Sequence, residues 1–136
     1  MTLEILDTLQ ATQMVHMATC ENGQPRLRPM TLICKGRRLY IATGATDHKS
    51  AQIAANPRAE FCLLYRDGAN TGYLRGSGTL AQVDDVPRKK EVADFATFIY
   101  DYWQDAADPG YRLYELQIAQ LRYMKPGDML ESVLDI

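Results

Sequence analysis

The sequence predicts an α+β protein that is mainly β, built as an antiparallel barrel of about six strands with helices packed outside it. Several segments alternate apolar and polar residues with the two-residue period of a strand. Short turns join most of them, including an Asn-Gly pair at residues 22–23, which is the strongest local indication of a hairpin. The chain has 136 residues, the size of one domain, so we expect residues 1–136 to form a single unit.

The first half of the chain predicts a short helix followed by three strands. Residues 2–12 carry leucine and isoleucine at helical spacing behind Thr2, which favours an amphipathic helix. The Asn-Gly turn is flanked by the segments MVHMATC and QPRLRPMTLIC, and a second turn, KGRR, leads into LYIATG. These three runs predict a meander of antiparallel strands over residues 14–44.

A second helix and two more strands are expected next. The helix is predicted over DHKSAQIAANP and ends at Asn56, because a residue before proline avoids the helical region. The fourth and fifth strands are predicted over RAEFCLLYR and GYLRGSGTLAQV. Three glycines of the fifth strand, at positions 72, 76 and 78, have two interpretations: bends of a barrel, or close approach of a ligand to the backbone.

The last third of the chain predicts one long helix and a final strand. The helix begins at Asp84 or Asp85, just before Pro87, and the sequence DPG ends it. Four apolar residues share one face at helical spacing: Val92, Phe95, Ile99 and Trp103. The alternating segment that predicts the sixth strand is YRLYELQIAQLRYMKP. The spacing of Trp103 with Phe95 and Ile99 favours a core residue.

Composition and charge exclude several classes of function. The net charge is −2, and lysine and arginine are scattered along the chain, so we expect no nucleic-acid partner. No apolar run approaches the roughly 20 residues of a membrane span, and the N-terminus lacks a signal-peptide pattern, so we expect a soluble cytoplasmic protein with no membrane partner. The three cysteines and two histidines have neither disulfide nor metal-ligand spacing, which favours reduced, packed cysteines and no metal site.

One segment, TGATDHKS at residues 43–50, has a charge pattern that disfavours the helix it begins. It places His48 and Lys49 in the first helical turn, where the partial positive charge of the helix end disfavours cations. A bound anion would reverse that cost, because N–H groups, hydroxyls and basic side chains would all attract it. The segment therefore predicts a phosphate site, against the alternative of a solvated lysine on a surface helix.

The strand RLRPMTLI supports the phosphate interpretation. Strand alternation places Arg28 on the face opposite to Pro29 and Thr31. In a meander this strand lies beside the one that ends at Thr43, so Arg28 can reach the same anion as Lys49. The alternative is an ordinary surface arginine. Together the two segments favour a cofactor that carries a phosphate.

These segments, in the order RLRPMTLI…LYIATGATDHKSAQIAANPRAEFCLLY, resemble the FMN-binding split-barrel proteins related to pyridoxamine 5′-phosphate oxidase. A second segment, NTGYLRGSGTL, is similar to a glycine-rich stretch in small bacterial FMN-binding proteins of the same fold. The match spans about residues 12–84. The resemblance implies a six-stranded antiparallel split β-barrel with peripheral helices, FMN as the cofactor, and a homodimer with each flavin at the subunit interface.

The resemblance also implies which residues bind the cofactor. The FMN phosphate would be held by Arg28 and Lys49, and the backbone of residues 29–31 would follow the edge of the isoalloxazine ring. Tyr73 would reach the flavin from the partner subunit, at about the position where the oxidase proper carries a glutamine. As an alternative to a place in the core, Trp103 and Tyr102 would cover a face of the flavin. The full set of implied cofactor-binding residues is Arg28, Pro29, Met30, Thr31, Thr43, Gly44, His48, Lys49, Ser50 and Tyr73.

The sequence leaves the reaction open and indicates no catalytic dyad, which a flavoprotein does not need. The chain ends KPGDMLESVLDI, without the arginine and histidine with which true pyridoxamine phosphate oxidases grip their substrate, so we do not expect vitamin B6 oxidation. Heme-degrading relatives use a histidine toward the C-terminus, whereas the last histidine here is His48. Three alternatives follow: an FMN-dependent oxidoreductase of small molecules, resembling nitroimidazole reductases and general stress proteins; a flavin-binding electron carrier; or a split barrel that uses a deazaflavin or lacks a cofactor.

Overall fold

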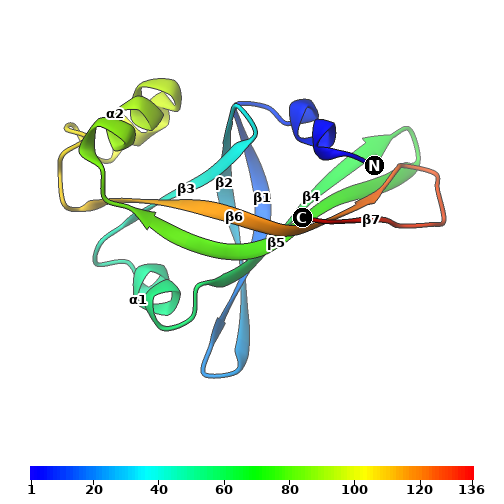
Figure 1. Ribbon diagram of the computed structural model, residues 1–136, viewed down its shortest axis with the longest axis horizontal. Helices are drawn as coiled ribbons and strands as arrows, with labels where there is room; N and C mark the ends of the chain where they lie inside the picture. The colour runs from blue at the N-terminus through cyan, green and yellow to red at the C-terminus, as the bar shows by residue number, and fades with distance from the viewer.

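The structure is a computed structural model that describes residues 1–136 except for the side chains of His48 and Lys49 (Figure 1). The helices and strands, with η for a 3₁₀ helix, are η1 (Leu3–Thr8), β1 (Thr12–Glu21), β2 (Gln24–Lys35), β3 (Arg38–Gly44), α1 (His48–Ala55), β4 (Arg58–Asp67), β5 (Asn70–Val83), α2 (Val86–Phe95), η2 (Thr97–Asp101), β6 (Tyr111–Met124) and β7 (Ser132–Asp135). The helices lie at the periphery of one strongly curved sheet.

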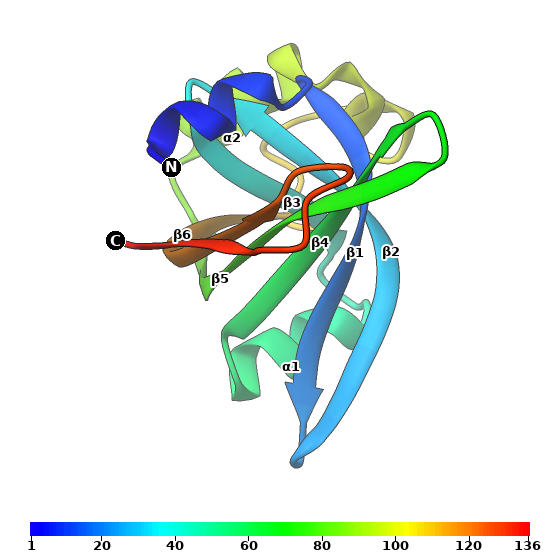
Figure 2. The same cartoon turned by 90° about the vertical axis from the view of Figure 1, so that its right-hand side faces the viewer.

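The strands form one antiparallel sheet in the order β3-β2-β1-β4-β5-β6-β7. An additional pairing of β3 with β6 closes the first six strands into a barrel (Figure 2). The predicted fold class is therefore confirmed, including the peripheral helices. The prediction did not include β7, because its four residues are too few to show a period; it extends the sheet by pairing with the second half of β6.

Two hairpin turns set the register of the first three strands. Asn22 and Gly23 have φ angles of 50° and 79°, and Gly36 and Arg37 have 56° and 66°. Both turns therefore have left-handed backbone at both central positions, the geometry that matches the twist of paired strands. The Asn-Gly signal is confirmed, and β1 and β2 pair along almost their whole length.

The barrel is open between β2 and β3. These strands pair only next to their connecting turn, at residues 33–35 of β2 and 38–40 of β3. Beyond that point β3 continues along β6, with which it pairs from Leu39 to Gly44. The result is a gap between two diverging strands, and this gap positions the candidate site.

Two apolar clusters stabilise the fold. One fills the barrel and includes the buried residues Met17, Leu32, Ile41, Phe61, Leu74 and Leu121. The other joins α2 and η2 to the outside of the barrel and includes Ile33, Val92, Ala93, Ile99, Tyr111 and Leu113. Leu32 and Ile33 show how strand alternation divides β2 between the two clusters. Burial of the second cluster places η2 beside the open gap.

The long helix predicted after residue 84 is interrupted, so that prediction is wrong in part. α2 ends at Phe95, and Ala96 has non-helical backbone angles, φ −109° and ψ 78°, before η2 begins. Val92 and Ile99 are buried as predicted, but Phe95 is 41% exposed. A 3₁₀ helix has three residues per turn, so the 3.6-residue period does not hold across the break.

The glycines of β5 are required by the barrel itself. A Cβ atom at Gly76 would overlap the buried ring of Phe61. At Gly78 it would overlap the carbonyl oxygen of Gln117, where β5 shifts its register against β6. Gly72 likewise lies against the backbone of the β6 end. The close approach at these glycines is therefore made by neighbouring parts of the chain, which supports a structural role within the barrel.

Other predictions concern the N-terminus and the cysteines. The helix predicted over residues 2–12 is the shorter 3₁₀ helix η1, because Thr12 already pairs in β1. Cys20, Cys34 and Cys62 are free and partly buried, as predicted. Among the described residues, no group of three or more histidine, cysteine or acidic side chains is suited to hold a metal ion. No helix in the described part of the chain has the length and hydropathy of a membrane span.

Candidate functional site

A pocket of about 460 Å³ opens where β2 and β3 diverge. Its volume lies within the range of small-molecule sites. Four regions line it: β2, the end of β3, the connection from β3 to α1, and the η2 region. The lining residues are Pro29, Met30, Thr31, Ala42, Thr43, Gly44, Thr46, Asp47, Phe98, Tyr102 and Trp103. Residues 29–31, Thr43 and Gly44 belong to the set that the sequence predicted.

One wall of the pocket is the edge of β2 along which β3 no longer pairs with it. Lys35 pairs with Arg38 across the two-residue turn, and in such a turn these two residues exchange backbone hydrogen bonds. Backbone direction alternates along a strand, so the odd-numbered residues of β2 direct their N–H and C=O groups toward β3. The even-numbered residues direct theirs toward β1. Pro25 and Pro29 both occupy odd positions, where the missing N–H does not interrupt the pairing with β1. The N–H of Thr31 therefore faces the gap.

The corner between β3 and α1 is fixed by buried hydroxyl groups. Ser50 Oγ donates to the carbonyl oxygen of Gly44 at 2.7 Å and lies 3.0 Å from Thr43 Oγ1. Because the Ser50 hydroxyl has one proton, Thr43 is the donor in the second bond. Both hydroxyls thus hold the start of α1 against the end of β3. Thr46 and Asp47 immediately precede α1 and line the pocket, so the first turn of α1 lies at one end of it.

Aromatic side chains from the η2 region form a second wall. Phe98, Tyr102 and Trp103 line the pocket. Trp103 also stacks on the buried Tyr111, with 5.4 Å between ring centroids and 24° between ring planes. Tyr102 is 73% exposed at the surface. Trp103 therefore packs against the second apolar cluster, as the core interpretation predicted, and it also faces the pocket.

Arg28 is directed away from the pocket wall formed by its neighbours. Its side chain lies on the face of β2 opposite to Pro29 and Thr31, as alternation predicted. Its Nη2 donates to Oε1 of Gln52 on α1 at 2.8 Å, and the same oxygen accepts from Thr19 Oγ1 at 3.0 Å. The structure thus brings Arg28 to the helix whose first turn carries the predicted lysine. A guanidinium has five N–H donors, so the bond to Gln52 leaves others for a ligand.

Among the predicted site residues whose side chains the structure describes, Arg28, Ser50 and Tyr73 do not line this pocket. The side chains of His48 and Lys49 lie outside the described part of the structure. Tyr73 lies on β5, which is three strands away from β2 in the sheet order. Within one chain, Tyr73 and the pocket are therefore separate.

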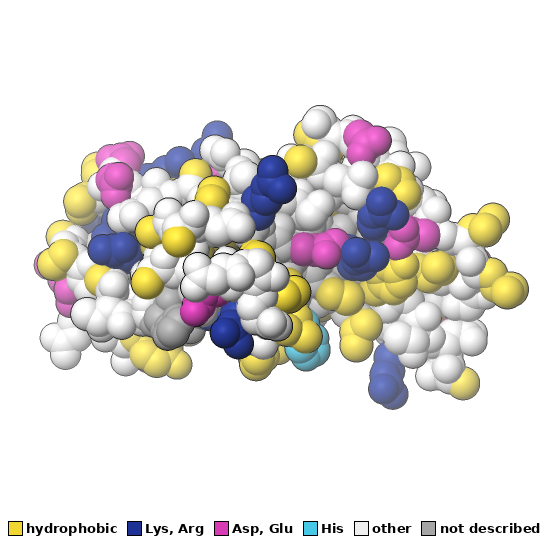
Figure 3. All heavy atoms as spheres, turned by 90° about the horizontal axis from the view of Figure 1, so that it is seen from below, with side chains coloured by type: hydrophobic (Ala, Val, Ile, Leu, Met, Phe, Trp, Pro, Cys, Tyr) yellow, Lys and Arg dark blue, Asp and Glu magenta, His cyan; other side chains and the backbone are white. Residues whose placement is uncertain are grey.

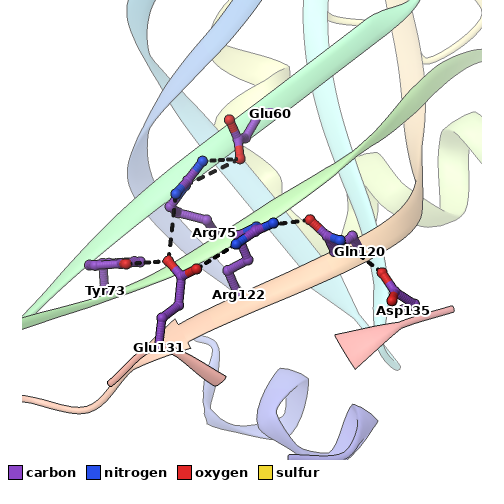
Figure 4. Close-up of polar contacts among 7 residues, drawn as sticks. All are labelled: Glu60, Tyr73, Arg75, Gln120, Arg122, Glu131 and Asp135. Atoms are coloured by element: carbon purple, nitrogen blue, oxygen red, sulfur yellow. Dashed lines mark hydrogen bonds and ion pairs between the residues drawn. The ribbon is translucent and has the colours of Figure 1, made fainter. Parts of the chain in front are cut away.

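Tyr73 belongs to a polar cluster on β4, β5, β6 and the segment before β7 (Figure 4). Its hydroxyl donates to Glu131, which also accepts from Arg122 Nη1 at 2.5 Å. Arg75 pairs with Glu131 and donates to Glu60 from Nη2 at 2.8 Å. The hydrogen bonds from Tyr73 and Arg122 hold the pKa of Glu131 below its usual value, so the carboxylate is ionised at neutral pH. The cluster ties the C-terminal segment to the sheet.

Sequence reasoning missed four of the pocket residues. Thr46 and Asp47 carried a signal, because they lie inside the segment TGATDHKS that was singled out for an anion. Ala42 and Phe98 carried none, because small or apolar residues on a strand or helix are typical of a core. They line the pocket only because η2 packs beside the open gap.

The arrangement suits a flat ring system with an anionic tail. Aromatic and apolar side chains can stack on the ring, and the strand edge can form hydrogen bonds to its polar rim. The first turn of α1 can attract an anion at the end of the pocket.

Comparison with known proteins agrees with this fold. The family model described as pyridoxamine 5′-phosphate oxidase matches residues 1–125. General stress protein 26 of Bacillus subtilis strain 168 is 24% identical over 134 residues, which is 98% of this chain and 94% of that protein.

Two solved structures show how far the likeness extends. A NimC/NimA family protein from Clostridium acetobutylicum has a TM-score of 0.79 at 18% identity, covering 98% of this chain and 89% of that one. General stress protein 26 from Bacillus anthracis strain Sterne has a TM-score of 0.76 at 20% identity, covering 98% and 96%. At these identities the two structures show a shared fold. With the family match over residues 1–125, the chain belongs to the pyridoxamine 5′-phosphate oxidase family.

Proposed function

We propose that this protein binds FMN in the pocket between β2 and β3 and acts as an FMN-dependent oxidoreductase on a small molecule. The observation that carries the proposal is a strand edge and an aromatic wall that line one pocket of about 460 Å³. Such walls fit a flat ring system, because aromatic side chains stack on its face and backbone groups bond to its rim. Membership in the pyridoxamine 5′-phosphate oxidase family supports a flavin as that ring system.

In this proposal the isoalloxazine ring lies along residues 29–31 of β2. The N–H of Thr31 faces the gap and can donate to a nitrogen or carbonyl oxygen of the ring. Trp103 and Tyr102 offer stacking surface. A bound flavin supplies the electron-transfer chemistry, and the protein binds it, orients it and limits its access to water.

The FMN phosphate would lie at the first turn of α1. The N–H groups of a helix start attract an anion, but Asp47 brings a carboxylate to the same end of the pocket. Basic side chains must therefore make the site attractive to phosphate. Arg28, already bonded to α1 through Gln52, is one of them. Lys49 and His48, in the first turn of the helix, are the others.

We further propose a homodimer with the flavin at the subunit interface. The outer face of β1, β2 and β4 exposes Met14 by 60%, Leu27 by 69% and Leu64 by 55%. The strand register places these side chains on the same face as Pro29 and Thr31 of the pocket wall. Figure 3 shows a face of the molecule on which hydrophobic side chains gather beside basic and acidic ones. A second copy would cover such a patch and close the pocket mouth.

The same face gives Tyr73 a route to the flavin. Tyr73 pairs with Leu64 across β4 and β5, so it shares the proposed interface, although it is three strands from β2 in its own chain. A partner packed face to face would bring its own Tyr73 to this pocket. We place the dimer in the cytoplasm, where the three free cysteines stay reduced.

The proposed function is tested by the absorption spectrum of the purified protein after addition and removal of excess FMN. We expect retained flavin, with bands near about 450 and 370 nm, bound once per chain. Oxidation of NADH or NADPH in the presence of a small acceptor then separates an enzyme from an electron carrier. A protein that retains no FMN contradicts the proposal. If the protein retains a deazaflavin and no FMN, the cofactor is a deazaflavin.

Thr31→Pro is expected to weaken FMN binding about two- to tenfold, the effect of losing one backbone hydrogen bond of about 0.5–1.5 kcal/mol. The substitution removes the N–H that faces the gap and leaves the hydrogen bonds between β2 and β1 in place. Pro25 and Pro29 are already accommodated in β2 in the same way. Fluorescence titration with FMN measures the change. Thr31→Ala, which keeps the N–H, serves as the matched control. Equal affinities of Thr31→Pro and Thr31→Ala would show that this N–H does not contact the flavin.

The double variant Leu27→Glu with Leu64→Glu is expected to be monomeric. Each substitution places a charge in the apolar patch that the second copy would cover, where an unpaired charge is strongly unfavourable. Analytical ultracentrifugation of the variant and the parent measures the mass. Val86→Glu, on α2 at 45% exposure, is the control and is expected to stay dimeric. A dimer that survives the double variant would place the interface elsewhere.

A further inference from the structure

Helix α2 carries a buried ammonium group beside the second apolar cluster. Lys89 is 8% exposed, although lysine is rarely buried. Burial lowers the pKa of Lys89, and the carboxylates of Asp84 and Asp108 act against that shift. An apolar side chain at this position would join α2 to the cluster without the desolvation of a charge. The burial of the ammonium therefore requires a reason beyond packing.

Two hydrogen bonds join Lys89 and Tyr111. Lys89 Nζ donates to the carbonyl oxygen of Tyr111 at 2.6 Å, and the Tyr111 hydroxyl donates to the carbonyl oxygen of Lys89 at 3.2 Å. The ammonium also lies 4.6 Å from the centroid of the Tyr111 ring, within the range of a cation–π interaction. Tyr111 is fully buried, and burial raises its pKa, so the ring stays neutral.

Tyr111 connects this ammonium to the pocket. Its ring stacks on the indole of Trp103 at 5.4 Å, and Trp103 lines the pocket. A continuous series of contacts thus runs from Lys89 through Tyr111 to the pocket wall. Because both ends of Tyr111 are fixed by Lys89, the surface against which the indole rests is fixed as well.

We propose that Lys89 is a positioning residue for the pocket: it fixes Tyr111 and thereby Trp103, and its charge favours the reduced, more negative state of a ring bound against Trp103. The first part concerns this chain alone, and the second rests on the proposed function. The ammonium lies 4.6 Å from the Tyr111 centroid, which lies 5.4 Å from that of Trp103, so a ring stacked on Trp103 is within about 15 Å of the charge. At roughly 10–15 Å, in a medium of effective dielectric constant about 20, a unit charge changes the binding of an anion by about five- to twentyfold.

The positioning part is tested in cofactor-free protein, because Trp103 is the single tryptophan of the chain and reports the stack by fluorescence. In Lys89→Met we expect a shifted emission maximum and stronger quenching by acrylamide, since the indole loses its fixed neighbour. Lys90→Met is the matched control: Lys90 is the next residue on α2, pairs with Asp94 at 2.7 Å at the surface, and should leave the emission unchanged.

Three further variants separate charge from folding. Lys89→Arg keeps the charge and is expected to restore the parent emission. Lys89→Gln keeps a donor for the Tyr111 carbonyl without the charge. Lys89→Leu lacks both the donor and the charge, and it replaces Lys89→Met if that variant does not fold. Emission and quenching that match the parent in Lys89→Met or Lys89→Leu overturn the positioning part.

The electrostatic part is tested by the midpoint potential of bound FMN. In Lys89→Gln we expect the midpoint potential to fall by about 20–40 mV, which is the five- to twentyfold change converted for a two-electron couple. In Lys89→Arg we expect little change of the potential. An unchanged potential overturns this part. If the parent protein binds no FMN, the proposed function fails on its own, and the fluorescence of the cofactor-free variants alone decides the role of Lys89.

Discussion

Gly78→Ala is expected to lower the free energy of unfolding by about 2–4 kcal/mol. The added Cβ would overlap the carbonyl group of Gln117 on β6, at the point where the register of β5 and β6 shifts. Since the overlapping atoms belong to backbone, relief requires the two strands to move apart, and a change of side-chain rotamer does not help. Denaturant unfolding measures the loss, which corresponds to a fall in Tm of roughly 10 °C.

Gly44→Ala is the matched control for this prediction. The nearest atoms to a Cβ at Gly44 are Trp103 Cζ2 at 3.8 Å and Asp47 Cβ at 3.9 Å, which is ordinary van der Waals distance. We therefore expect its stability to stay within about 0.5 kcal/mol of the parent. If Gly78→Ala were equally stable, β5 and β6 would not be paired in the register described.

Arg28→Ala is expected to weaken FMN binding by about 10- to 100-fold, because it removes a charge-assisted contact to phosphate of about 1.5–3 kcal/mol. Arg28 is suited to this contact because its bond to Gln52 already holds the guanidinium against α1. The fold is expected to persist, since the variant loses one partly buried hydrogen bond. Titration with FMN measures the affinity, and Lys49→Ala receives the same test.

Arg26→Ala provides the comparison for Arg28→Ala. Arg26 lies two residues earlier on β2 and is exposed, and Arg26→Ala removes the same charge. We expect nearly parental FMN affinity. Arg28→Lys tests geometry, because a lysine keeps the charge but not the forked donor. Equal losses in Arg26→Ala and Arg28→Ala would indicate long-range attraction of FMN and no direct phosphate contact.

The local elements of this fold are strongly encoded in short segments. The Asn-Gly pair produced the predicted hairpin, since left-handed backbone at both positions is easiest for those residue types. The helix predicted before Asn56-Pro57 is α1, because the residue before proline leaves the helical region. Both signals depend on backbone sterics of neighbouring residues, so no distant contact is needed to set them.

The composition of the pocket was predictable only in part. Residues 29–31, Thr43 and Gly44 lie in segments whose charge and turn residues are unusual, and these segments do line the pocket. Phe98 carries no local signal of a pocket residue, because nothing in its own helix shows that β2 and β3 separate beside it. The direction of Arg28 was predictable from strand alternation, but its partner Gln52 was not, because that contact depends on how α1 packs.

The sequence by itself determined the first six strands, the tight turns and the start of α1, because each depends on residues close together in the chain. Only the tertiary structure decided that β3 leaves β2 for β6, that η2 supplies an aromatic wall, and that Lys89 contacts Tyr111. Those features depend on pairing between distant strands and on burial of a second apolar cluster. Such contacts are chosen by the free energy of the whole molecule, and no local pattern specifies them.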